Sequence, residues 1–169
     1  MTGVPEIAAY RLMRVLTLLA LLTMTVGCDR VTKHWAVASL AGAPDRSFLA
    51  GTLQLEYAEN EGGFLSIGSN LPPSARLAIF SVATSLMLIG LLIIGIKYHR
   101  SYWHLVALSL AFAGGVSNVL DRITRGTVID FMTVGVGHVR TGVFNVADVA
   151  ILAGIFMFLV WPGNKPVRR

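Results

Sequence analysis

"ARLAIFSVATSLMLIGLLIIGI", residues 75–96, is an apolar run in which Arg76 is the only charged side chain. An α-helix needs roughly 20 such residues to cross the hydrocarbon core of a bilayer, because each residue adds about 1.5 Å to its length. The run therefore predicts a transmembrane helix, and the residues on either side of it indicate whether the whole chain is built for that environment.

The whole chain has the composition of an integral membrane protein. Of its 169 residues, 54% are hydrophobic and 14% are charged, whereas about a quarter of an ordinary soluble chain is charged. Three more apolar runs approach the length of a membrane span. We expect an all-α membrane protein that forms a single integral membrane domain over residues 1–169. Its expected spans are 12–27, 75–96, 102–120 and 146–161, with outer segments at 28–74 and 121–145.

Lysine and arginine residues assign the two sides of the membrane, because cytoplasmic segments retain them. The segments on one side carry seven basic residues and a single acid, Glu6, whereas the outer segments and their borders carry seven basic residues and eight acids. Both termini are therefore expected in the cytoplasm, and the net charge of +5 requires no nucleic-acid partner. The seven cytoplasmic basic residues are Arg11, Arg14, Lys97, Arg100, Lys165, Arg168 and Arg169.

The first run ends in "TVGC", residues 25–28, which is similar to the cleavage site of a bacterial lipoprotein signal sequence. Thr25 stands where such sites usually hold Leu, and a secreted product would not carry three further spans. We therefore interpret 12–27 as a retained membrane anchor with Cys28 at its outer end. A single cysteine also excludes an internal disulfide and a cysteine-based metal site.

Both outer segments contain patterns typical of β-strands. In "GTLQLEYAEN", residues 51–60, Leu53, Leu55 and Tyr57 alternate with polar side chains, which is the period of a half-buried strand. "GTVIDFMTVGVGHVR", residues 126–140, is rich in β-branched residues and glycine. We expect these stretches to form a small sheet on the outer membrane surface.

Two acids stand at the predicted outer membrane boundary, where an ionisable side chain is costly and therefore suggests a function. Asp130 lies in the second β-like stretch and Asp148 one turn into the last span, with 17 residues between them. That connection is long enough to bring the carboxylates together. Two adjacent carboxylates share one proton, so one activates water as a base while the other protonates an amide carbonyl. Such peptide hydrolysis needs no metal and no cofactor.

Each acid also has a structural interpretation. Asn145 followed three positions later by Asp148 is a capping-box-like pattern at the start of the last helix, where the helix dipole favours an acid. Asp130 would alternatively pair with a neighbouring arginine, Arg122, Arg125 or Arg140. The residues alone leave the catalytic and the structural interpretations open.

Other polar residues occur in pairs at helical spacing. Asp29 and Lys33 are four positions apart, as are Asn118 and Arg122, so each pair would share one helix face. We expect an ion pair between the first two, and an orienting or substrate-holding role for the second two. Asp121 stands at the unfavourable end of a helix and is expected to pair with a basic neighbour.

Serine and histidine chemistry has little support in the sequence. Ser117 in "GVSN" would suit an intramembrane serine protease, but it lacks a convincing histidine partner. The four histidines are scattered and show no metal-binding spacing.

Five polar clusters together resemble, in order and spacing, the motifs of the bacterial lipoprotein signal peptidases (signal peptidase II). They are "DRVTK" (29–33), "NEGGFLSIG" (60–68), "GGVSNVLDR" (114–122), "GTVIDF" (126–131) and "FNVADVAI" (144–151). The clusters are spread over most of the chain. Glu61 and Phe64 depart from the neutral and small residues that many family members carry in the second cluster.

The resemblance implies a membrane-embedded aspartic endopeptidase with four transmembrane helices and a small extracytoplasmic β-cradle. It would lie in the bacterial cytoplasmic membrane with its active site at the outer face, and would cut prolipoproteins before a diacylglyceryl-modified cysteine. Membrane lipids would be its other partners, and it would act as a monomer without cofactor or metal. By motif, the catalytic pair falls on Asp130 and Asp148. The implied substrate-binding or supporting residues are Asp29, Lys33, Asn60, Gly62, Gly114, Asn118, Asp121, Arg122 and Asn145.

Two other functions fit a small membrane chain with buried acids. A small membrane transporter would usually show inverted repeats or broken helices, which this sequence lacks. A non-catalytic membrane scaffold would explain the spans but not two acids in paired motifs on the outer side. Cleavage of a lipidated precursor distinguishes the three functions.

Overall fold

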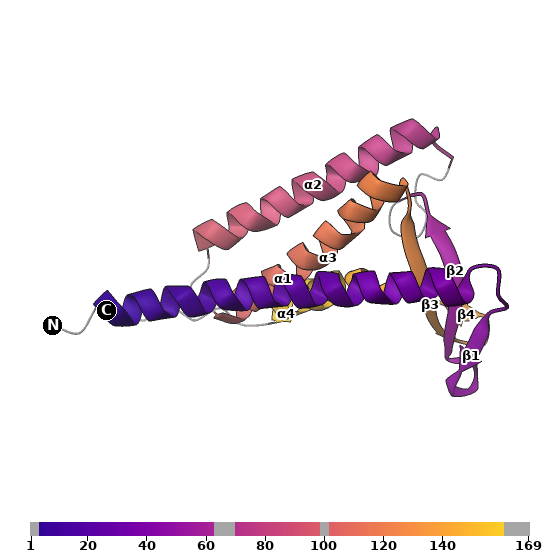
Figure 1. Cartoon of the computed structure of the whole chain (residues 1–169), viewed down its shortest axis with the longest axis horizontal. Coiled ribbons are helices and arrows are strands. Elements are labelled where there is room, and N and C mark those ends of the chain that lie inside the picture. The colour runs from indigo at the N-terminus through magenta and orange to yellow at the C-terminus, as the bar shows by residue number, and fades with distance from the viewer. Residues whose placement is uncertain (1–3, 63–69, 99–101, 161–169) are drawn as a thin grey trace.

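The computed structural model describes residues 4–62, 70–98 and 102–160. Within them the chain forms four α-helices, one short 3-10 helix and a four-stranded sheet (Figure 1). The elements are α1 (Val4–Leu40), β1 (Arg46–Phe48), η1 (Leu49–Gly51), β2 (Leu53–Asn60), α2 (Pro73–Tyr98), α3 (Tyr102–Arg125), β3 (Val128–Val136), β4 (Val139–Arg140) and α4 (Val146–Val160). Outside the described residues lie Trp161, the end of the last predicted span, and four of the basic residues used for orientation, Arg100, Lys165, Arg168 and Arg169.

The helices follow the apolar runs of the sequence. Within the described residues, two helical stretches are long and apolar enough to cross a membrane, Leu12–Leu40 of α1 and Tyr102–Arg125 of α3. Ala78–Leu91 of α2 and the whole of α4 are apolar but shorter. The protein is therefore mostly helical, with a helical part made of membrane-compatible segments.

Large apolar side chains face outward along these helices. Leu19 of α1 is 54% exposed and Leu159 of α4 is 75% exposed, whereas Asp29 and Asn145 are fully buried. A water-soluble protein has the opposite preference. This surface suits a hydrocarbon surrounding and leaves the interior for polar groups.

Helix α3 is central, because it contacts α1, α2 and α4, whereas α2 diverges from α1 (Figure 1). Two glycines permit the closest helix contact. A Cβ atom at Gly114 would collide with the carbonyl oxygen of Ala147, and one at Gly154 would collide with that of Ala107. Backbone atoms cannot move aside easily, so α3 and α4 cross at a separation that only glycine permits. This crossing places Ala147, the neighbour of Asp148, against α3.

The sheet lies at the end of the molecule where α1 and α3 end (Figure 1). Its strand order is β1-β2-β3-β4 and all neighbouring strands are antiparallel. The strands predicted from alternation and from β-branched residues are thus confirmed. Ala36 and Leu40 of α1 form a buried cluster with Ile129 and Phe131 of β3, so apolar packing attaches the sheet to the first helix.

A β-bulge sets the register between β2 and β3. Leu55 pairs with Met132, but the pairing then shifts so that Ala58 lies opposite Asp130 and Asn60 lies opposite Val128. Opposite residues place their side chains on the same face of an antiparallel pair. Asn60 therefore lies on the same face as Asp130 and diagonally next to it.

Helix α1 extends beyond the predicted span 12–27 and continues to Leu40. Likewise, α3 extends beyond the predicted span 102–120 and continues to Arg125, so Asp121 and Arg122 lie near its end as predicted. Asp29 on the extra turns of α1 finds polar partners on α3 and α4, so the helix has no need to end where its apolar run ends. The first part of the segment 28–74 is consequently helical.

Candidate active site

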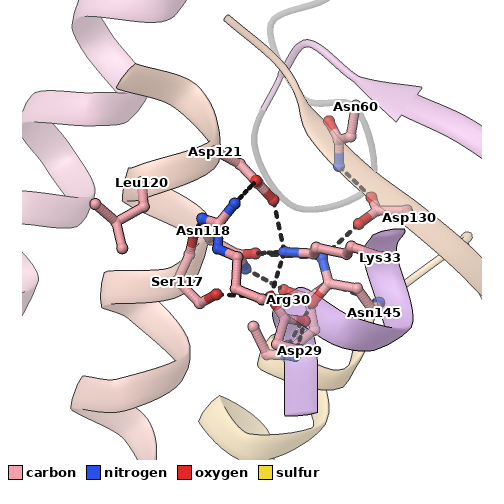
Figure 2. A network of polar contacts seen from close by, with 12 residues as sticks. Asp29, Arg30, Lys33, Asn60, Ser117, Asn118, Leu120, Asp121, Asp130 and Asn145 are labelled. Carbon is pink, nitrogen blue, oxygen red and sulfur yellow. Dashed lines mark hydrogen bonds and ion pairs between the residues drawn. The ribbon is translucent and has the colours of Figure 1, made fainter. Parts of the chain in front are cut away.

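The carboxylate of Asp130 is held by two side-chain amides. It is 2% exposed, and its Oδ2 accepts a hydrogen bond of 2.9 Å from Asn60 Nδ2. Its Oδ1 accepts one of 2.6 Å from Asn145 Nδ2 (Figure 2). Among the described residues no ion pair joins Asp130 to an arginine. The hydrogen bonds that its carboxylate accepts come from asparagine amides, and Arg122 acts on it through charge without a direct ion pair.

Asp148 lies in the first turn of α4 and forms the expected capping box with Asn145. The backbone N–H of Asp148 donates to Asn145 Oδ1 at 2.9 Å, and that of Asn145 donates to Asp148 Oδ2 at 3.2 Å. The other carboxylate oxygen, Oδ1, accepts a hydrogen bond of 2.8 Å from Asn118 Nδ2. The capping role predicted for Asp148 is thus confirmed. Its Oδ1 has a further partner, Asn118, on a different helix.

Asn145 connects the two acids. Its side chain is fully buried, with Nδ2 donating to Asp130 and Oδ1 accepting from the amide of Asp148. Both carboxylates therefore accept a hydrogen bond from one asparagine, Asp130 from its side-chain amide and Asp148 from its backbone N–H. A single residue fixes the strand acid relative to the helix acid.

Burial and charge act together on Asp130. Its pKa is raised from 3.8 to about 6, chiefly because the side chain is removed from water and next because of the nearby charge of Asp148. The hydrogen bonds from Asn60 and Asn145, and the more distant charge of Lys33, oppose the increase. Asp130 can consequently hold a proton at a pH where an exposed aspartate cannot.

A buried lysine, Lys33, is connected to Asp148 through Asn118. Lys33 Nζ forms ion pairs of 2.7 Å with Asp29 Oδ2 and with Asp121 Oδ2, and donates a hydrogen bond of 2.8 Å to Asn118 Oδ1 (Figure 2). The predicted ion pair between Asp29 and Lys33 is confirmed. Asp121 also forms an ion pair of 2.5 Å with Arg30 Nη1. The predicted pairing of Asp121 with a basic neighbour is therefore confirmed, and it has two such partners, Lys33 and Arg30.

Asp29 links this cluster to the start of α4. Its Oδ1 accepts a hydrogen bond of 2.9 Å from the backbone N–H of Ala147, and its Oδ2 accepts one of 2.6 Å from Ser117 Oγ. Two side chains thus cap the first turn of α4: Asn145, which directly precedes the helix, and Asp29, which lies on α1. Free amides at a helix N-terminus favour such acids.

The end of β2 is fixed by the remaining predicted residues. Asn60 Oδ1 accepts a hydrogen bond of 3.0 Å from the N–H of Gly62, and the carbonyl oxygen of Gly62 accepts one of 3.0 Å from Arg122 Nη2. Arg122 therefore binds the chain backbone next to Asn60. Gly63 and Phe64 of the same motif lie outside the described residues.

The structure gathers ten of the eleven predicted site residues into this hydrogen-bonded region. The exception is Gly114, which serves helix packing against Ala147 instead of contributing a polar group. The sequence prediction missed Arg30 and the structural use of Ser117. A signal for Ser117 was its spacing of four from Asp121, which places both on one face of α3.

Two aspartates whose carboxylates accept hydrogen bonds from asparagine side chains thus lie where the apolar helices meet the sheet. Residues 21–162 match the family model described as Signal peptidase (SPase) II. The chain belongs to this family.

Relatives and solved structures agree with this assignment. The lipoprotein signal peptidase of Streptococcus thermophilus is 29% identical over 136 residues, covering 80% of this chain and 84% of that protein. That of Streptococcus pyogenes serotype M6 is 30% identical over 141 residues, covering 82% and 88%. A bacterial membrane enzyme solved by the in meso method at 1.9 Å resolution is 27% identical, with a TM-score of 0.71 and coverage of 85% of this chain and 90% of that one.

Proposed function

We propose that this member of the signal peptidase II family removes signal peptides from prolipoproteins with Asp130 and Asp148 as its catalytic dyad. The observation that carries the proposal is that Asn145 binds both acids, Asp130 through its side-chain amide and Asp148 through its capping box. The acids come from a strand and a helix, and this bridge holds them at one place.

The chemistry follows from two carboxyl groups that share one proton. The ionised member accepts a proton from water as the oxygen attacks the scissile amide carbonyl, and the protonated member donates to the carbonyl oxygen. Proton return to the departing amine completes the cleavage. The raised pKa of Asp130 supports this scheme, since a proton must remain on the pair near neutral pH.

The proposed setting is a four-span protein in the bacterial cytoplasmic membrane, with both termini inside and the sheet outside. The spans 12–27, 75–96, 102–120 and 146–161 belong to one domain of residues 1–169. The outward apolar side chains support this arrangement. A diacylglyceryl-modified substrate stays in the bilayer, so its scissile bond is met where the helices end and the sheet begins.

The test is cleavage of a synthetic prolipoprotein by the purified chain in detergent micelles, with the products identified by mass spectrometry. We expect a single cut immediately before the diacylglyceryl-modified cysteine. A matched precursor without the lipid is expected to be cut far more slowly. Equal rates for both precursors, or a cut elsewhere, would contradict the proposed substrate class.

A further inference from the structure

Lys33 is buried at the centre of the polar cluster, yet it is no part of the reaction scheme. Its side chain is 3% exposed, which is rare for lysine unless its charge is compensated. Asp29 and Asp121 provide that compensation through ion pairs of 2.7 Å each. The contact with Asp121 Oδ2 is an ion pair without hydrogen-bond geometry, since this oxygen has no hydrogen-bond partner among the described residues. Lys33 also donates a hydrogen bond to Asn118 Oδ1, in addition to these two ion pairs.

An asparagine side chain carries a donor and an acceptor, and its environment decides which end points where. A lysine ammonium group can only donate. Because Lys33 Nζ lies 2.8 Å from one end of the Asn118 amide, that end must be the oxygen. The NH2 group is then the end that faces Asp148, where it donates to Oδ1 at 2.8 Å.

The other two amides beside the dyad are oriented by backbone donors. Asn60 Oδ1 accepts from the N–H of Gly62, and Asn145 Oδ1 accepts from the N–H of Asp148. Each therefore offers its NH2 group to Asp130. Asn118 Oδ1 accepts the shorter hydrogen bond, 2.8 Å, from the charged Lys33 and a longer one, 3.3 Å, from Asn145 Nδ2. Of these three asparagines, and within the part of the chain that the structure describes, Asn118 alone has a charged side chain as its nearest orienting donor.

We propose that Lys33 is a positioning residue that fixes the amide direction of Asn118, so that Asp148 receives an N–H donor and not a repelling carbonyl oxygen. Hydrogen bonds donated to a carboxylate favour its ionised form. Lys33 thereby sets the pH range in which the dyad has one ionised member, in addition to any effect of its charge. This inference rests on the proposed dyad.

The amide direction is separable from simple charge, because the cluster offers a charge-balanced substitution. Among the described residues, the charged groups that direct contacts and charge interactions place around Lys33, Asn118 and the dyad are Asp29 and Arg30 on α1, Asp121 and Arg122 on α3, Asp130 on β3 and Asp148 on α4. Lys33→Met removes one positive charge, and adding Asp121→Asn removes one negative charge that pairs with it. The double variant keeps the net charge but lacks the ammonium group that donates to Asn118 Oδ1 and leaves only the longer hydrogen bond from Asn145 Nδ2.

The experiment measures kcat/KM against pH for cleavage of a lipidated precursor by purified enzyme. We expect the profile of Lys33→Met/Asp121→Asn to shift to higher pH by about one pH unit, the size expected for losing one hydrogen bond to an ionised group. KM should change little, since Lys33 is buried. The matched control is Arg30→Met, which removes a cation that also pairs with Asp121 but that hydrogen-bonds elsewhere, to the Ser117 carbonyl. It reports the effect of one lost positive charge in the cluster, so its shift should be clearly smaller than that of the double variant.

A wild-type profile for the charge-balanced variant would overturn the inference, because only charge would then matter. If the Lys33 variants do not fold, Asn118→Ala decides the question, since it leaves every ion pair in place. It removes the N–H donor to Asp148 and must produce the same shift; an unshifted profile would refute the proposed role. Activity of Asp130→Asn or Asp148→Asn would instead refute the dyad itself, so the two failures are distinguishable.

Discussion

The side-chain amide of Asn145 donates a hydrogen bond of 2.6 Å to Asp130, a residue 15 positions earlier on a different element. The same asparagine immediately precedes α4, and its Oδ1 accepts a hydrogen bond from the backbone N–H of Asp148. Asn145 therefore both caps α4 and contacts the two acids. The helix-capping and the catalytic interpretations of Asp148, which the sequence leaves open, are compatible. Substitutions at these three positions separate the two roles.

The dyad is tested by Asp130→Asn and Asp148→Asn. Asparagine has nearly the same shape as aspartate but cannot ionise or transfer a proton, so each variant should lose turnover by roughly 10,000-fold or more. The double variant should be little worse than either single one, because the acids act as a unit. Cleavage of the lipidated precursor by folded, purified variants measures this. Near-normal turnover in either single variant would show that its carboxylate is only a structural group.

The raised pKa of Asp130 predicts a pH-dependent cost to stability. A carboxyl whose pKa is 3.8 in the unfolded chain and about 6 in the fold binds its proton more tightly when folded. Its stabilising contribution is complete below about pH 4 and is lost as the pH rises through about 6, a change of about 3 kcal/mol. Asp130→Asn does not titrate. Its Tm relative to that of the wild type should therefore rise between pH 4 and 7, in thermal unfolding in detergent; a constant difference would contradict the shift.

The two roles of Asn145 are separated by Asn145→Ser and Asn145→Ala. Serine retains a side-chain oxygen for the cap but has no NH2 group to reach Asp130. Asn145→Ser should thus stay near wild-type stability while losing activity, whereas Asn145→Ala should lose activity and about 1 kcal/mol of stability. Thermal unfolding and precursor cleavage on the same preparations measure both. Full activity of Asn145→Ser would exclude the bridge from catalysis.

The close contact of α3 and α4 predicts unequal effects of two glycine substitutions. Gly114→Ala places a Cβ atom against the carbonyl of Ala147, so it should cost about 1–3 kcal/mol and displace the first turn of α4 with Asp148. A Cβ atom added at Gly90 of α2 would meet none of the described residues within 4 Å, and Gly90→Ala should be neutral or slightly stabilising. Unfolding in detergent compares the two. Equal stability would mean that the helices separate without cost.

The proposed orientation is tested by reporter fusions. An enzyme that is active only outside the cytoplasm should be active when inserted near Asp45, between α1 and β1, and inactive when fused after Arg169. The reason is the excess of basic residues on the side assigned to both termini. The reverse pattern of activity would place the dyad on the cytoplasmic face and reject the proposed topology.

Much of the fold is readable from the sequence because it depends on local periodicity. The apolar runs predict the helices, and the alternation from Leu53 to Tyr57 predicts a strand where β2 lies. The ends of helices are less local. Helix α1 continues past Gly27 because Asp29 and Lys33 find partners on α3, which no window of neighbouring residues reveals.

The sequence by itself determined the helical and strand segments and the family, and it predicted Asp130 and Asp148 as the catalytic pair, since these follow from composition, period and motif order. Only the tertiary structure decided how the acids are held. Without the bulge after Leu55, the pairing with Met132 would continue to place Glu59 opposite Val128; with it, the neutral amide of Asn60 takes that position and reaches Asp130. The physical reason is that a one-residue shift in strand register exchanges the two faces of a strand, and long-range packing, not local sequence, fixes that register.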